Sequence, residues 1–201
     1  MKILNILETT LEAEGETYFF RKGKREDIPK ATECINLAYD MWLEDGFKQR
    51  DKTEDEVSKY FQKDGYILEN KDHEIISVGC VSKVYPIFED KKITLQCSHQ
   101  CYSAGLNELG EKLSLQSDTS GLFFYGLAVL PKYAKKGIGE VFLRKGFDVA
   151  REMKVSFCYL ETGLETWLVD WYRRFGFEVV GSERVEGIGK STVVMVQKFE
   201  N

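Results

Sequence analysis

The sequence LFFYGLAVLPKYAKKGIGEVFLRKGFDVA, residues 122–150, decides the fold of this chain. Its first eight residues, LFFYGLAV, form an almost uninterrupted apolar run, which is typical of a central strand covered on both faces. Pro131 cannot donate a ladder hydrogen bond, so the strand is predicted to end before it. From Gly137 onward, apolar residues recur at helical spacing. The stretch therefore predicts a buried strand, a short loop and an amphipathic helix.

The junction between this strand and this helix has the composition of an anion-binding site. The first turn of a helix has N–H groups without intrahelical partners, and the helix dipole favours an anion there. Gly137 and Gly139 carry no side chain that would keep a phosphate group away from these donors. Lys135 and Lys136 add positive charge. The residues alone leave two interpretations open: a phosphate or pyrophosphate cradle, and a helix start whose glycines serve packing.

The junction resembles the acyl-CoA loop of the GNAT superfamily of N-acyltransferases, in which Arg/Gln-x-x-Gly-x-Gly/Ala follows a strand and grips the CoA pyrophosphate. Ala134 stands where that family usually has Arg or Gln. A second similarity lies downstream, where Tyr172, Gly176 and Phe177 match the family's Tyr-x-x-x-Gly-Phe. The resemblance implies an α/β GNAT fold, with a mixed central β-sheet flanked by helices and strands that splay at the acyl-CoA site.

The same resemblance implies an N-acetyltransferase that moves an acetyl group from acetyl-CoA, its co-substrate, to a primary amine. The end of the central strand would pair with the pantetheine arm, and the backbone N–H groups of the loop would bind the pyrophosphate. The cofactor-binding residues expected on this basis are Leu127, Ala128, Val129, Lys135, Lys136, Gly137, Ile138, Gly139 and Glu140.

Two catalytic residues are expected. By resemblance, Tyr172 gives a proton to the leaving thiolate, although helical spacing alone would place it in the apolar stripe over residues 164–175. Glu161, at the end of the strand predicted after the central one, is the first choice for the general base. Glu44 and Asp45, at the end of the first predicted helix, are an alternative pair that could bind a cationic acceptor.

Two other motifs are weaker. Cys97, His99 and Cys101 crowd three potential metal ligands into one segment, but structural zinc usually pairs two separated ligand clusters. Residues 189–192, GKST, look like the end of a P-loop, but Arg184 stands at the position of its first glycine. We therefore expect neither a metal site nor a P-loop.

Composition limits the remaining possibilities. A chain of 201 residues that is 43% hydrophobic fits a single domain over 1–201, with 86–121 as a probable insertion. The net charge of −5 argues against a nucleic-acid partner. Five irregularly spaced cysteines fit free thiols in a reducing compartment. No apolar run approaches a membrane span and Glu8 interrupts the N-terminal apolar segment, so a cytoplasmic protein is expected.

The rest of the chain can be divided by its apolar periodicity and its turn residues. Residues 1–15 form either an extra strand or a short helix, and one helix is expected from Arg25 to Gly46. A capping box over residues 53–56 starts a second helix, which Gly65 ends. Further strands are predicted over 17–21, 66–69, 74–85, 155–160, 177–180 and 192–199. Inside the insertion, a strand is possible over 93–97 and a helix over 106–115.

Three functions stay open at this level. The favoured one is acetyl transfer to a small-molecule amine, because the 86–121 segment could wall the acceptor site. A protein or peptide N-acetyltransferase is the second, and a module that senses acyl-CoA without turnover is the third. A homodimer is possible, with the same segment as a contact.

Overall fold

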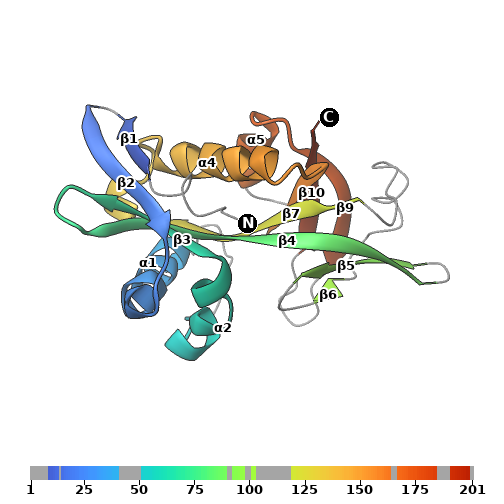
Figure 1. The fold of residues 1–201 in the computed structure, drawn as a ribbon, viewed down its shortest axis with the longest axis horizontal. Helices are drawn as coiled ribbons and strands as arrows, with labels where there is room; N and C mark the ends of the chain where they lie inside the picture. The colour runs from blue at the N-terminus through green and yellow to red at the C-terminus, as the bar shows by residue number, and fades with distance from the viewer. Residues whose placement is uncertain are drawn as a thin grey trace. The chain divides into compact units, whose positions relative to one another are not determined.

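The computed structural model describes residues 9–13, 15–40, 51–89, 92–97, 101–102, 119–163, 167–184 and 191–199. In these residues ten strands form one mixed sheet in the order β1-β2-β3-β4-β7-β8-β10-β9, and β5 pairs with β4 and β6 beside this path (Figure 1). The predicted class, a mixed α/β sheet flanked by helices, is confirmed.

The strands are β1 Thr9–Ala13, β2 Glu16–Lys22, β3 Gly65–Asn70, β4 Ile75–Glu89, β5 Lys92–Cys97, β6 Cys101–Tyr102, β7 Gly121–Val129, β8 Phe157–Gly163, β9 Glu178–Arg184 and β10 Ser191–Lys198. The α-helices are α1 Ile28–Asp40, α2 Glu54–Asp64, α4 Ile138–Glu152 and α5 Trp167–Arg173. Two short 3-10 helices, η1 Arg25–Asp27 and η3 Pro131–Tyr133, precede α1 and α4.

The chain divides into two compact units, each assembled from two stretches of sequence. Unit 1 contains Met1–Val81 and Tyr125–Val149, and unit 2 contains Ser82–Phe124 and Ala150–Asn201. The divisions at residues 81/82 and 124/125 fall inside β4 and β7, so both strands contribute residues to both units. The single domain with an insertion over 86–121 stays a prediction.

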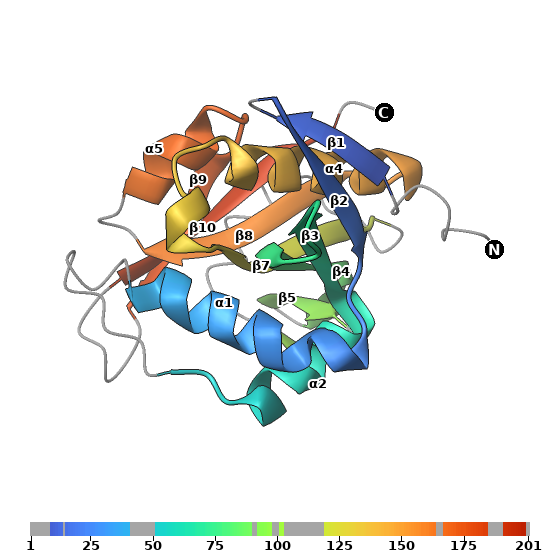
Figure 2. The ribbon, with the colours of Figure 1, turned by 90° about the vertical axis from the view of Figure 1, so that its left-hand side faces the viewer.

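Unit 1 has helices on both faces of its strands, α1 and α2 on one face and α4 on the other (Figure 2). The α1–α2 face is closed by an apolar cluster that includes Ile35, Phe61 and Val78, each at most 2% exposed. On the α4 face, a Cβ on Gly79 would come within 2.5 Å of the Phe142 ring. Gly79 therefore lets α4 lie close to the sheet.

The ends of α2 follow the predicted signals. The Glu56 N–H donates to the Thr53 hydroxyl at 3.3 Å, and the Thr53 N–H donates to the Glu56 carboxylate at 2.9 Å. This reciprocal pair is the expected capping box. At the other end, a Cβ on Gly65 would lie 2.4 Å from the Phe61 carbonyl oxygen. A side chain is therefore excluded where α2 turns into β3.

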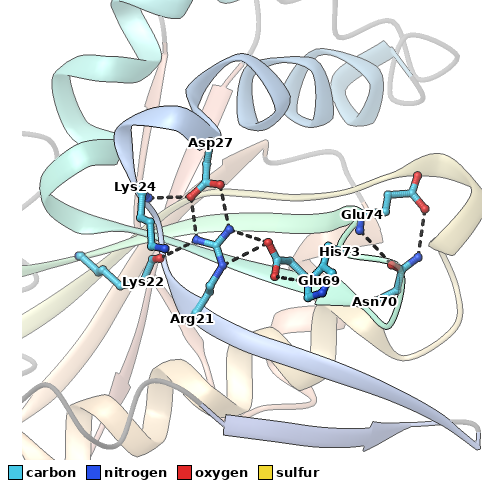
Figure 3. A network of polar contacts seen from close by, with 8 residues as sticks. All are labelled: Arg21, Lys22, Lys24, Asp27, Glu69, Asn70, His73 and Glu74. Atoms are coloured by element: carbon cyan, nitrogen blue, oxygen red, sulfur yellow. Dashed lines mark hydrogen bonds and ion pairs between the residues drawn. The ribbon is translucent and has the colours of Figure 1, made fainter.

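A charged network ties β2 to the start of α1 and to β3 (Figure 3). The Arg21 guanidinium donates to both Asp27 carboxylate oxygens, at 2.8 and 2.9 Å, and to Glu69 Oε1 at 2.5 and 3.1 Å. Burial acts to raise the pKa of Asp27, but hydrogen bonds from Arg21 and the Lys24 N–H outweigh it and lower that pKa. The network favours the charged form of Asp27 and links β2 to Glu69, near the end of β3.

In unit 2, two strands that the apolar runs predicted form a parallel pair. β7 pairs with β8 from Gly121↔Phe157 to Phe124↔Leu160, and β10 lies antiparallel to both β8 and β9. The rings of Phe123 and Tyr159, which oppose each other in this register, stack with centroids 4.4 Å apart. The central strand predicted over 122–129 is confirmed as Gly121–Val129, in which residues 121–124 and Ala128 are buried and the other residues are half-buried.

Several bounds differ from the sequence prediction. β4 continues to Glu89 instead of ending at residue 85, because Pro86 is accommodated in the pairing with β5, opposite Leu95. β8 covers Phe157–Gly163 instead of 155–160, and β1 resolves the ambiguous N-terminal segment as a strand. The strand predicted over 93–97 is confirmed as β5. The predicted helix over 106–115 and the predicted helix end at residue 46 lie outside the described residues.

Candidate active site

Gly126 interrupts the regular backbone of β7. Its φ is 63°, in the left-handed region that favours glycine. It lies two residues after Phe124, the last residue of β7 that pairs with β8. Gly126 belongs to neither of the two family patterns in the sequence, although a lone glycine inside an apolar strand is a known sign of a bulge. The kink separates the β8-paired half of β7 from its last three residues.

The last three residues of β7, Leu127–Val129, were the expected partners of the pantetheine arm. Their backbone N–H and C=O groups alternate in direction along the strand. The Ala128 carbonyl accepts the Ser77 hydroxyl of β4 at 2.8 Å, and the Leu130 N–H donates to the Ile76 carbonyl at 2.9 Å. Backbone groups of successive strand residues point to opposite sides. Leu127 and Val129 therefore direct their N–H and C=O groups away from β4.

The loop after β7 has the backbone of an anion-binding concavity. Lys135 has a φ of 62° and Gly137 a φ of 75°, and these two left-handed residues flank Lys136. Left-handed residues next to ordinary ones turn successive N–H groups toward a common point, which forms an anion-binding nest. A Cβ on Gly137 would meet no heavy atom within 4 Å, so space is open at this position.

The first turn of α4 begins directly after Gly137 and adds further backbone N–H groups. The Val141 N–H donates to the Gly137 carbonyl at 3.0 Å, and the N–H groups of Ile138, Gly139 and Glu140 precede it in the helix. The Glu140 carboxylate accepts from Arg144 at 2.8 Å, which offsets its negative charge in this turn. With the exposed Lys135 and Lys136, these donors fit a phosphate or pyrophosphate group.

The Tyr-x-x-x-Gly-Phe pattern forms the C-terminal cap of α5. Gly176 has a φ of 86°, its N–H donates to the Arg173 carbonyl at 3.0 Å, and the Phe177 N–H donates to the Tyr172 carbonyl at 3.3 Å. These two bonds are those of a Schellman motif, which usually adds an apolar contact between the same end residues. The Tyr172 and Phe177 rings make that contact at 5.7 Å. Gly176 and Phe177 thus fix the position of Tyr172.

Tyr172 and Glu161 both lie in unit 2, whereas all the expected cofactor-binding residues lie in unit 1. Tyr172 is 9% exposed and its ring also contacts Trp171 at 4.8 Å. Glu161 is exposed on β8, opposite Val194 of β10. Tyr172 lies on a helix as expected, whereas Glu161, expected at the end of a strand, lies inside β8. The catalytic roles of both residues stay predictions.

A polar cluster on β7 and α2 was missed. The Tyr125 hydroxyl donates to Asp64 Oδ2 at 3.1 Å, and the Lys22 ammonium donates to the Lys63 carbonyl at 2.5 Å. Burial lowers the pKa of Lys22, an effect that the nearby Asp64 charge opposes. Tyr125 and its partner Asp64 lie 61 residues apart in sequence. No sequence periodicity links residues so far apart.

The structure does not describe the alternative acceptor-binding pair or the potential metal ligands named from the sequence. Glu44 and Asp45, and the side chains of Cys97, His99 and Cys101, are not among the described groups. Within the described part of the chain, no group of three or more His, Cys, Asp or Glu side chains is placed to hold a metal ion. In the same residues, no helix is long and apolar enough to cross a membrane.

Comparison of the sequence with models of known protein families identifies the class of protein to which this chain belongs. The sequence model of the acetyltransferase (GNAT) family matches residues 35–177. This match covers more than half of the chain, so the chain belongs to the acetyltransferase (GNAT) family and is an acyltransferase. A comparison with curated protein sequences found no match.

Solved structures of this family share the fold. The ribosomal-protein-S18-alanine N-acetyltransferase from Escherichia coli matches with a TM-score of 0.61 and 14% identity, over 92% of this chain and 95% of its own. A GNAT acetyltransferase from Listeria monocytogenes 4b F2365 matches with a TM-score of 0.64 and 12% identity, over 95% and 100%. N-acetylglutamate synthase from Neisseria gonorrhoeae, solved with coenzyme A and N-acetyl-glutamate, matches with a TM-score of 0.57 and 15% identity, over 92% and 35%.

Proposed function

We propose that this protein transfers an acetyl group from acetyl-CoA to a primary amine. The observation that carries the proposal is the loop before α4. There, two left-handed residues at 135 and 137 precede the N–H groups of residues 138–140, and in this proposal a pyrophosphate accepts hydrogen bonds from these groups. Membership of the acetyltransferase (GNAT) family supports the same function.

The proposed cofactor site extends from the loop back along β7. Leu127 and Val129 would offer their backbone groups to the pantetheine arm, whereas the Ala128 carbonyl is occupied by Ser77. Lys135 and Lys136 would add positive charge at the pyrophosphate. In this proposal Ala128 contributes its small, buried side chain and not a hydrogen bond to the cofactor.

The proposed chemistry needs two proton transfers. The amine nitrogen bonds to the acetyl carbonyl carbon, and the carbon–sulfur bond of the thioester breaks. Tyr172 would donate its hydroxyl proton to the leaving sulfur, and Glu161 would accept the proton that the amine loses. Tyr172 is suited to this role because the cap formed by Gly176 and Phe177 holds it in one position.

A small-molecule amine is the acceptor that we favour. The preference rests on the 86–121 segment, which we expect to wall the acceptor site. A protein or peptide amine is the alternative, since the E. coli neighbour is named for alanine acetylation of a ribosomal protein. The acceptor panel must therefore contain both kinds of amine.

We also propose a cytoplasmic location. Cys34, Cys80 and Cys158 are buried free thiols, and such thiols persist in a reducing compartment. Burial raises the pKa of Cys34 to about 12, so this thiol stays protonated and unreactive. A homodimer stays a prediction.

Turnover of acetyl-CoA over an amine panel tests the proposed function. Coenzyme A release would be measured with polyamines, amino acids, aminoglycosides and N-terminal peptides, and products would be identified by mass spectrometry. We expect acetyl-CoA to raise the melting temperature, because it binds the folded state, and at least one amine to be acetylated. Stabilisation without transfer to any amine would favour a sensor of acyl-CoA. No stabilisation at millimolar acetyl-CoA would contradict the proposal.

A further inference from the structure

The loop before α4 is attached to the turn between β3 and β4 through Tyr133. The Tyr133 hydroxyl donates to Glu74 Oε2 at 3.0 Å and accepts from the Asn70 side-chain amide at 2.9 Å. Lys132, the preceding residue, places its ammonium 2.6 Å from Glu74 Oε1. Two adjacent residues of η3 are thus held by one turn of a neighbouring hairpin.

The turn that holds them is itself fixed. Asn70 Oδ1 accepts from the N–H groups of Asp72 and Glu74, both at 3.0 Å, and its side-chain amide also donates to Glu74 Oε2 at 3.1 Å. The preceding residue, Glu69, is the carboxylate that Arg21 binds (Figure 3). A rigid network therefore continues from β2 through the turn to η3.

The same contacts involve two lysines of the loop, Lys132 and Lys136. The hydrogen bond and charge of Glu74 raise the pKa of Lys132, and the Lys132 hydrogen bond lowers the pKa of Glu74. The Lys136 ammonium lies 5.4 Å from the centroid of the Tyr133 ring, within the range of a cation–π contact. Glu74 thus pairs with Lys132, which precedes the nest. The Tyr133 ring contacts Lys136, which lies inside the nest.

We propose that Asn70, Glu74 and Tyr133 are positioning residues for pyrophosphate binding: the β3–β4 turn holds η3, so that the N–H groups of residues 135–140 stay directed at the ligand. None of the three side chains is required to touch the cofactor. The inference rests on the proposed function, because it gives these contacts a role in coenzyme A binding. It adds residues that neither sequence motif contains.

Two substitutions and two matched controls test the inference. Tyr133→Phe removes the hydroxyl and keeps the ring beside Lys136, and Glu74→Gln removes the ion pair with Lys132. Tyr18→Phe removes another hydroxyl that donates to a carboxylate, that of Glu16 at 3.0 Å. Glu33→Gln removes another ion pair, with Lys30 at 3.0 Å on α1. All four residues lie in unit 1, so each control matches its test variant in chemistry and in unit.

The dissociation constant of coenzyme A would be measured by calorimetry for the wild type and all four variants. We expect it to rise about tenfold in Tyr133→Phe and Glu74→Gln, the loss of one hydrogen bond to a charged group, and to change less than about twofold in the controls. With an acceptor from the amine panel, KM for acetyl-CoA should rise while kcat stays within about twofold, because the reacting atoms are untouched. Unchanged affinity in both test variants would overturn the inference, as would equal losses in the controls.

Amide hydrogen exchange of the ligand-free protein makes a second, independent readout. The amides of residues 132–140 should exchange faster in Tyr133→Phe than in Tyr18→Phe or the wild type, because the loop has lost its anchor. Unchanged exchange over these residues would overturn the inference even where coenzyme A binding is normal. A wild-type protein that binds no coenzyme A would instead reject the proposed function, with the exchange data still reporting whether the turn holds the loop.

Discussion

Replacing Gly137 with aspartate is expected to abolish coenzyme A binding in a protein that still folds. A Cβ at this position would meet no heavy atom within 4 Å, and aspartate tolerates the left-handed φ of 75° better than most residues. Its carboxylate would lie at the start of α4, where the pyrophosphate is proposed to bind. Two unit charges about 4 Å apart, at an effective dielectric of about 20, repel by about 4 kcal/mol, or about a thousandfold in the dissociation constant measured by calorimetry.

Gly137→Asn is the matched control for this substitution. Asparagine has nearly the same size and the same tolerance of a left-handed backbone, but it carries no charge. We expect both variants to lose similar thermal stability, with the asparagine variant losing no more than about tenfold in affinity, because hydrogen-bonding contacts with an anion remain possible. A folded aspartate variant with wild-type affinity would place the pyrophosphate elsewhere. Equal losses in both variants would show that bulk alone blocks the site.

Replacing Tyr172 with phenylalanine is expected to lower kcat about a hundredfold with little change in coenzyme A affinity. General acid catalysis contributes about a hundred- to ten-thousand-fold, and a thiolate is already a fair leaving group, so the low end applies. The ring contacts with Trp171 and Phe177 should survive, since only the hydroxyl is lost. Steady-state kinetics with saturating acetyl-CoA and the best amine of the panel would measure the effect.

The same loss of a hydroxyl in Tyr18→Phe serves as the control, with kcat expected to stay within about twofold of the wild type. The pH dependence adds a second test, because the deficit of Tyr172→Phe should be largest where protonation of the leaving group limits the rate. Wild-type kcat at every pH would remove Tyr172 from the mechanism. It would then be a residue that packs α5 through its contact with Phe177.

The sequence predicts best the features that depend on residues close together in the chain. The apolar run over 122–129 became β7, and the capping box at Thr53 started α2. The pattern from Tyr172 to Phe177 has a local explanation too, since the two backbone hydrogen bonds of its cap, from Gly176 and Phe177, fall within one helix end. Local spacing and local hydrogen bonding determine each of these features, so one sequence suffices to predict them.

The conformation of the anion-binding loop was predictable in part. Gly137 predicted the start of the helix, and in the structure it has the left-handed φ that only glycine adopts freely. Lys135 has the same left-handed conformation although it is not a glycine, so its residue type did not predict this conformation. Likewise, Gly126 was read as part of an apolar strand, although its φ of 63° breaks the regularity of β7.

Contacts between distant residues could not be predicted. Tyr133 meets Glu74 across 59 residues and Asn70 across 63, and Tyr125 meets Asp64 across 61. Such pairs depend on the order in which β3, β4 and β7 lie in the sheet, which hydrophobic periodicity does not specify. The continuation of β4 past Pro86 was missed for the same reason, because its pairing partner, β5, determines it.

A titration of 15N-labelled protein with acetyl-CoA, followed through the backbone amide resonances, tests the central claim most directly. The claim is that the nest before α4 and the end of β7 bind the cofactor through their backbone groups. The largest shifts are expected at the amides of residues 136–140, with further shifts at Leu127 and Val129. Saturable binding that leaves these amides unchanged while moving others would contradict the claim, as would the absence of any binding at millimolar acetyl-CoA.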